Sequence, residues 1–215
     1  MKSVRIKYSK DDSVKYVAHL DTLKTFTRAA RRANLPLTYS QGFNPHPHMV
    51  FGLPSSVGMI SVCEYADIDF EDGIACEEIM EGFNNNLPQG FRILECHEKT
   101  SKSNIMAEIK SSQFVIYIQC GKSVPDLQDI VTHFICRQEI PVMKKSKKGM
   151  RETDIKNMIH FISVGEDNVG LYLITEIAAG NESNLKPSLL IEAINVHEDA
   201  GIKIKQIIRT EMFLK

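Results

Sequence analysis

The feature that most constrains this chain is an order of strand-like and helix-like segments that occurs twice. Residues 4–10 (VRIKYSK) alternate apolar and polar side chains as a half-buried strand does. Residues 19–34 place apolar side chains at helical spacing. The other segments of the first set are strands at 48–53, 64–70 and 91–99 and a helix at 76–87. The resulting order, β-α-β-β-α-β, is that of a ferredoxin-like fold.

The same order begins again after a polar stretch, TSKSN at 100–104, which suits a linker. The second set comprises strands at 114–120, 169–179 and 204–214, helices at 126–138 and 186–196, and one or two strands within 140–165. The two halves share element order without visible sequence similarity. We therefore predict an α+β protein with two tandem ferredoxin-like halves, residues 1–99 and 112–215.

Composition places the chain among ordinary folded proteins. Its 215 residues are 43% hydrophobic and 25% charged, which argues against a disordered or fibrous chain. No apolar run approaches the roughly 20 residues that a membrane span needs, and the first residues lack the apolar stretch of a signal peptide. The sequence therefore predicts a cytoplasmic protein with no membrane partner.

The cysteines argue against a metal or iron–sulfur centre in this chain. There are five, none in a C-x-x-C arrangement, so we expect small buried thiols and no bound cofactor. The motifs of P-loop nucleotide hydrolases, dinucleotide-binding folds, zinc proteases and serine hydrolases are also missing. These enzyme classes lose most of their support.

Charge is distributed unevenly along the first half. Residues 1–52 carry nine Lys or Arg against three Asp, whereas 53–98 carry one Arg against ten acidic residues. The helix at 19–34, for which Asp21 is predicted as the N-cap, holds a group of bases. They are Lys24, Arg28, Arg31 and Arg32. A basic helix stripe suits phosphate contacts, although a solvated helix face explains it equally well.

The densest motif is YSQGFNPHPH at 39–48. Its two prolines exclude a helix and force extended backbone on the residues before them. A stiff loop that holds polar and aromatic side chains outward makes a recognition surface. The residues that we expect to contact nucleic acid there are Tyr39, Gly42, Phe43, Asn44 and His46. A purely structural turn remains the alternative.

Three histidines allow a catalytic interpretation. His46 and His48 share one side of an extended segment, and with His19 they could act as general acid and base or hold a metal. A second basic cluster lies in the C-terminal half, where Gly149 suggests a hairpin tip. Its candidate phosphate contacts are Lys144, Lys145, Lys147 and Lys148, which could equally form a solvated loop.

Residues 15–70 closely resemble the defining block of the radical SAM-linked proteins, a domain family of unknown function. The matching motifs are HLD, RRA-x-LP, YSQGFNPHP and EY-x-DI-x-F, and the later KP-x-LL and IIRTEMF resemble its closing elements. The chain departs from the pattern at His48, where a lysine is more usual. Members of this family occur alone or fused to a radical SAM protein and look associated with ribosome and RNA-processing genes.

The resemblance implies an accessory partner of a radical SAM enzyme that presents an RNA substrate, with no DNA partner. The iron–sulfur cluster and S-adenosylmethionine are then expected on that partner. Two alternatives stay open at this point. One is a metal-independent endoribonuclease that uses His19, His46 or His48, and the other is a protein–protein adaptor without RNA affinity.

Overall fold

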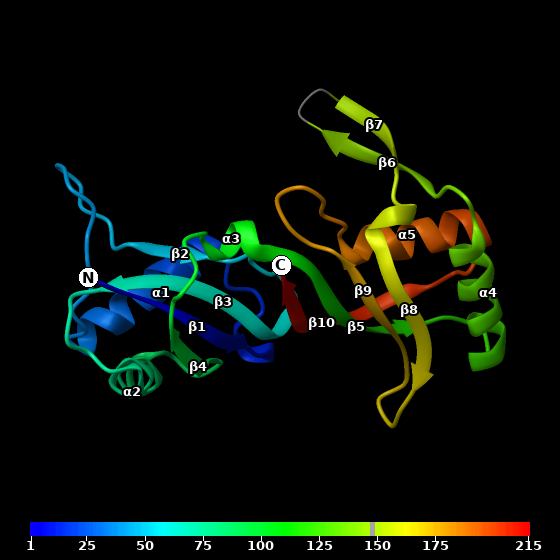
Figure 1. The fold of residues 1–215 in the computed structure, drawn as a ribbon. Coiled ribbons are helices and arrows are strands. Elements are labelled where there is room, and N and C mark those ends of the chain that lie inside the picture. The colour runs from blue at the N-terminus through cyan, green and yellow to red at the C-terminus, as the bar shows by residue number, and fades with distance from the viewer. Residues whose placement is uncertain (147–148) are drawn as a thin grey trace. The chain divides into compact units, whose positions relative to one another are not determined.

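The computed structural model describes residues 1–146 and 149–215 and is shown in Figure 1. The chain divides into two compact units. Unit 1 comprises Met1–Ile109 together with Leu214–Lys215, and unit 2 comprises Lys110–Phe213. The division between Ile109 and Lys110 falls within the interval 99–112 that separates the two halves in the sequence.

Unit 1 has the element order that its sequence pattern predicts. The elements are β1 (Lys2–Lys10), α1 (His19–Arg32), β2 (Met49–Phe51), β3 (Ile60–Phe70), α2 (Cys76–Asn86), β4 (Phe91–Glu98) and α3 (Ile105–Glu108), with a 3-10 turn at Asp12–Val14. Strand β1 lies between β4 and β3, and β2 pairs with β3. These pairs are antiparallel.

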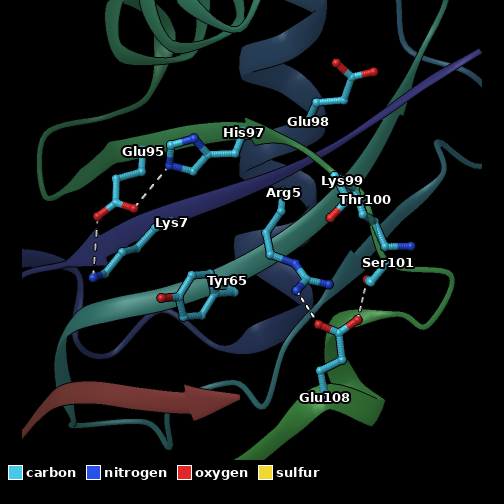
Figure 2. A pocket seen from close by; sticks show the side chains of 10 residues that line it. All are labelled: Arg5, Lys7, Tyr65, Glu95, His97, Glu98, Lys99, Thr100, Ser101 and Glu108. Atoms are coloured by element: carbon cyan, nitrogen blue, oxygen red, sulfur yellow. Dashed lines mark hydrogen bonds and ion pairs between the residues drawn. The ribbon is translucent and has the colours of Figure 1, made fainter. Parts of the chain in front are cut away.

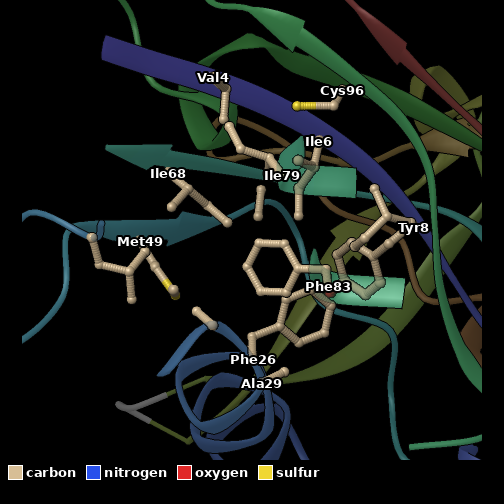
Figure 3. Packing of buried hydrophobic residues seen from close by; sticks show 14 of the residues in the cluster. Val4, Ile6, Tyr8, Phe26, Ala29, Met49, Ile68, Ile79, Phe83 and Cys96 are labelled. Atoms are coloured by element: carbon tan, nitrogen blue, oxygen red, sulfur yellow. The ribbon is translucent and has the colours of Figure 1, made fainter. Parts of the chain in front are cut away.

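The core of unit 1 lies between one face of the sheet and the helices α1 and α2. Alternation in β1 turns Val4, Ile6 and Tyr8 to this face, and all three are buried. Phe26 of α1 fills the centre, where its ring lies 4.8 Å from the ring of Tyr8 and 5.6 Å from that of Phe83 in α2. Figure 3 shows this packing. Burial of these faces fixes which sides of β1 and α1 point outward.

The predicted N-cap of α1 is wrong. The helix begins at His19 with Ala18 as its N-cap, and Asp21 lies in the first turn. Ala18 has no side-chain oxygen, so the helix begins without a side-chain cap, and the carbonyl of Ala18 accepts hydrogen bonds from the backbone N–H groups of Asp21 and Thr22. Asp21 still favours the helix, because a carboxylate in the first turn interacts well with the helix dipole. The helix also ends at Arg32, two residues before its predicted end.

Unit 2 contains more strands than the sequence predicted, because three strands and not one or two lie between residues 140 and 166. The elements are β5 (Ile109–Gln119), α4 (Val124–Cys136), β6 (Pro141–Ser146), β7 (Gly149–Asp154), β8 (Ile159–Glu166), β9 (Leu171–Ala178), α5 (Pro187–Glu198) and β10 (Lys203–Leu214), with a 3-10 turn at Lys156–Met158. The strands β10, β5, β9 and β8 are neighbours in that order. Strands β6 and β7 form a separate two-stranded sheet, which lies where the sequence suggested a basic hairpin.

The protein is therefore of mixed α+β class with mostly antiparallel sheets, as predicted. The assignment of each half to the ferredoxin-like fold stays a prediction, although both units combine four main strands and two long helices in the expected order. None of the helices among the described residues has both the length and the apolar character that a membrane crossing requires.

Candidate nucleic-acid interface

The exposed face of α1 carries the basic residues that the sequence singled out, in three different environments. Lys24 lies 3.5 Å from the carboxylate of Asp21, and both side chains are exposed. Arg28 is exposed, and within the described chain its guanidinium has no hydrogen bond or ion pair. Arg31 is also exposed and lies over the ring of Tyr39 at 5.8 Å. Arg28 therefore offers a positive charge that no described neighbour neutralises.

Arg32 has a structural role that the sequence did not indicate. Its guanidinium donates a hydrogen bond to the backbone carbonyl of Asn86, the last residue of α2. A cation at the C-terminus of a helix binds carbonyl groups that have no partner within the helix. Arg32 therefore joins the ends of α1 and α2, and it is a weaker candidate for phosphate than Arg28.

The motif at 39–48 forms a short hairpin between α1 and β2, which projects from unit 1 in Figure 1. Tyr39 and Pro47 pair as an antiparallel bridge. The backbone N–H of Ser40 donates to the carbonyl of His46 at 2.8 Å, and the hydroxyl of Ser40 accepts from the N–H of His46 at 3.0 Å. These bonds close the hairpin across its two prolines. We call α1 residues Lys24, Arg28 and Arg31 together with this hairpin the α1–hairpin surface.

The base of the hairpin is fixed to the rest of unit 1. The backbone N–H of His48 donates to Thr38, and the N–H of Asp69 in β3 donates to the carbonyl of His48. The hydroxyl of Tyr39 accepts a hydrogen bond of 3.3 Å from Nε of Arg31. The hairpin is thus held by β3 on one side and by α1 on the other, so its tip is presented from a rigid base.

The tip of the hairpin leaves its side chains outward. Gly42, Phe43, Asn44 and His46 are all exposed, and Phe43 has a relative exposure of 110%. Gly42 has a φ of +127°, a backbone conformation that residues other than glycine rarely adopt. The structure thus brings Gly42, Phe43, Asn44 and His46 to one projecting tip, whereas the predicted Tyr39 lies at the base of the hairpin, where it contacts Arg31.

The three histidines of the catalytic interpretation lie in different settings. Nδ1 of His48 is 3.5 Å from a carboxylate oxygen of Asp69, and the ring of His19 packs edge-on at 5.8 Å from the ring of Phe51. His46 takes part in the hairpin through its backbone. Within residues 1–146 and 149–215, no group of three or more His, Cys, Asp or Glu side chains is placed to hold a metal ion.

The basic cluster of unit 2 was predicted to contact phosphate, and the structure commits one of its lysines to another partner. Nζ of Lys144 donates a hydrogen bond of 2.9 Å to the carbonyl of Asn184, which commits this amine to the fold. Lys145 pairs with Met150 in the register of β6 and β7. The predicted contacts Lys147 and Lys148 lie outside the described residues.

The sequence missed a network of charges on the sheet face of unit 1 opposite the helices, shown in Figure 2. Arg5 of β1 donates to Asp67 of β3 at 2.7 Å and to Glu108 of α3 at 2.5 Å. The hydroxyls of Ser101 and Ser103 donate to the other oxygen of Glu108. The hydrogen bond from Arg5 is the main cause that lowers the pKa of Glu108 to about 2.

Arg5, Ser101 and Glu108 of this network line a pocket of about 320 Å³, and the network fastens the segment 99–108 to the sheet. The pocket also contains Lys7, whose amine lies 3.6 Å from Glu95. Three Lys or Arg side chains and three Glu side chains line it, so the pocket presents little net charge to a ligand. Residues 100–104 are therefore part of unit 1 and not a bare linker. The sequence carried a signal for this pairing: bases alternate in 2–10, as at Arg5 and Lys7, and acids alternate in 64–70, as at Asp67 and Asp69.

The cysteines are all free. Cys63 and Cys96 are buried as expected, Cys76 and Cys120 are half-buried, and Cys136 is exposed, so the expectation of a buried thiol is wrong for Cys136. The helix α4 ends at Cys136, which places its side chain at the surface. Burial and a hydrogen bond with Cys76 raise the pKa of the Cys96 thiol to about 12, which keeps it protonated and unreactive.

Comparison with known proteins gives a match to a protein family and similarity to solved structures. No curated protein matches the sequence. A chain from the crystal structure of a Cbf5–Nop10–Gar1 complex is similar in structure, with a TM-score of 0.56 and 14% sequence identity. The alignment covers 97% of the present chain and 48% of that chain, so the present chain spans about half of its length. At this identity the likeness concerns the fold alone.

The sequence match is to a protein-family model. The model is described as an uncharacterized protein conserved in bacteria (DUF2344), and it matches residues 3–187. This range contains the whole α1–hairpin surface and the charge network of Arg5. It ends at Pro187, the first residue of α5. Because the model covers most of the chain, the protein belongs to the DUF2344 family of uncharacterized bacterial proteins.

Proposed function

We propose that this protein binds RNA through the α1–hairpin surface and presents it to a radical SAM protein. The observation that carries the proposal is the charge of α1. Arg28 is exposed and has no partner in the described chain, and Arg31 is exposed beside the hairpin. Phosphate contacts from such residues supply most of the non-specific affinity of nucleic-acid-binding proteins.

The shape of the surface supports RNA as the ligand. A charged helix face alone binds any polyanion, but here a projecting loop with exposed aromatic, amide and imidazole groups stands beside the helix. Phosphate contacts position a nucleic acid, and polar and aromatic groups on a loop select unpaired bases. The similarity of residues 15–70 to the radical SAM-linked proteins adds the association with RNA-processing genes, and it favours RNA over DNA.

The same similarity supports the partner. In this proposal the radical SAM protein holds the iron–sulfur cluster and S-adenosylmethionine, and the present chain holds the substrate. These two roles match those expected in the fused members of the radical SAM-linked family, in which one chain contains both the radical SAM domain and the accessory domain. The endoribonuclease alternative has weaker support: the contact of His48 with Asp69 would suit a general base, whereas His19 packs against Phe51.

Two measurements test the proposal. Titration of fluorescently labelled cellular RNA with purified protein, at several salt concentrations, should show binding that weakens steeply as salt rises. Isolation of the native complex from cells should recover a radical SAM protein together with RNA. Recovery of the partner without any RNA affinity at low salt would instead identify a protein–protein adaptor. RNA cleavage by the purified chain alone would identify a nuclease.

A further inference from the structure

Phe43 is the most exposed large hydrophobic residue in the described part of the chain. Its relative exposure is 110%, compared with 71% for Tyr16, the next most exposed aromatic residue. An isolated protein loses stabilisation when it leaves a whole aromatic ring in water, because burying such a ring is favourable by about 1.5–3 kcal/mol. Because the hairpin presents Phe43 from a fixed base, its ring is available for a ligand to cover.

The hairpin that carries this ring is joined to α1 at its base by the contact between Arg31 and Tyr39. The pairing of Tyr39 with Pro47 closes the base of the hairpin, and Phe43 lies four residues beyond Tyr39. At ~3.3 Å per extended residue the tip stands at most roughly 13 Å from the base, because residues 41–44 form bends. This upper bound corresponds to no more than about four stacked nucleotides at ~3.4 Å each. One strand can therefore contact Arg28 or Arg31 with its phosphates and Phe43 with a base.

The chemistry beside Phe43 suits a nucleobase. Gln41 and Asn44 are both exposed, and each amide can donate and accept hydrogen bonds. No Lys, Arg, Asp or Glu occurs between residues 39 and 48, so the tip offers stacking and hydrogen bonds in place of ion pairs. These are the groups that recognise a base, whereas a phosphate is recognised by the cations on α1.

We propose that Phe43 stacks on an unpaired base of a single-stranded RNA segment, with the amides of Gln41 and Asn44 contacting the edge of that base. This inference rests on the proposed RNA-binding function and names its substrate class. In an A-form duplex the faces of the bases are stacked on each other, and the deep major groove excludes side chains. An exposed ring on a narrow hairpin therefore needs a loop, a bulge or a single strand.

The absence of tryptophan from the sequence makes a direct test possible. The variant Phe43→Trp introduces a single indole at the tip, and its fluorescence reports stacking at this position alone. The probes are a short adenosine-rich RNA single strand and the same strand annealed to its complement. We expect the single strand to quench the indole and the duplex to leave it unchanged.

Affinity measurements complete the test. The variant Phe43→Ala should bind the single strand roughly 5- to 150-fold more weakly and the duplex as the parent does, the range expected for loss of one base–aromatic stack. The matched control is Tyr16→Ala, which removes another exposed aromatic ring of unit 1 and should bind both probes as the parent does. Thermal melts should be unchanged, because Phe43 lies outside the core.

The outcomes separate this inference from the proposed function. Unchanged binding by Phe43→Ala and an unquenched indole, together with weaker binding by Arg28→Gln, would overturn base stacking and leave RNA binding intact. Failure of the parent to bind either probe at low salt would overturn both. If Phe43→Ala binds RNA normally and no longer recovers a protein partner from cells, the ring fills a protein pocket and base stacking is wrong.

Discussion

Replacing Arg28 and Arg31 with glutamine removes two positive charges from the exposed face of α1 while keeping long polar side chains. Neither residue belongs to the core of unit 1. Arg28 has no partner in the described chain, and Arg31 loses only its exposed contact with Tyr39. An exposed cation–π contact contributes about 0.5–1 kcal/mol, so the double variant should fold.

The expected effect on binding follows from counterion release. Each phosphate neutralised on a single strand contributes about 0.7 to the slope of log affinity against log salt concentration. Loss of both contacts should therefore reduce the slope by about 1.4. Relative to a 1 M reference, this corresponds to roughly 25-fold weaker binding at about 0.1 M salt. The double variant and the parent should converge at high salt.

The assay is titration of labelled single-stranded RNA by fluorescence anisotropy across a salt series. The matched control is Lys203→Gln with Lys205→Gln, which removes the same charge from exposed residues of unit 2. Its slope should equal that of the parent. If the α1 variant and the control lower the slope equally, binding depends on overall charge, and the assignment of phosphate contacts to α1 is refuted.

Three further predictions concern the fold that supports the surface. Phe26→Ala should lower the free energy of unfolding by about 3–5 kcal/mol, measured by chemical denaturation, because the ring is fully buried at the centre of the core. Gly90→Ala should lower it by more than about 1 kcal/mol, since Gly90 has a φ of +100° and an added Cβ would collide with Ser13. Stability should fall as the pH drops from about 4.5 towards 2, because Arg5 lowers the pKa of Glu108 to about 2 and protonation then removes the ion pair. Glu108→Gln should lack this contribution to the pH dependence, whereas equal pH profiles for parent and variant would contradict the pairing.

The sequence was sufficient where a pattern reports burial within one element. Alternation in β1 predicted the buried face with Val4, Ile6 and Tyr8, because successive side chains of a strand point to opposite faces. The helical spacing of 19–34 likewise predicted α1 and its exposed basic stripe. The two prolines of the 39–48 motif excluded a helix there, and the structure has a projecting hairpin.

The sequence was insufficient where a partner lies far along the chain. Arg32 contacts Asn86, 54 positions away, and Lys144 contacts Asn184, 40 positions away. The sequence had indicated both Arg32 and Lys144 as candidates to contact phosphate. The bond between Arg5 and Glu108 joins residues 103 positions apart, and it depends on the course of the segment after β4. Such pairings follow from sheet register and chain path, which periodicity does not determine.

The start of α1 shows a subtler limit. Asp21 has the right chemistry for an N-cap, but capping requires a residue whose own backbone is still extended. That conformation belongs to Ala18, which has a ψ of 161°. Composition alone could not separate a capping carboxylate from one in the first helical turn, because both positions favour acidic residues.

Ultraviolet crosslinking can show whether RNA lies on the α1–hairpin surface. Purified protein bound to labelled single-stranded RNA would be irradiated and digested, and the crosslinked peptides would be identified by mass spectrometry. We expect crosslinks within residues 39–48, centred on Tyr39 and Phe43, which disappear when Arg28 and Arg31 are replaced with glutamine. Crosslinks confined to unit 2, or an unchanged pattern in that variant, would contradict this expectation.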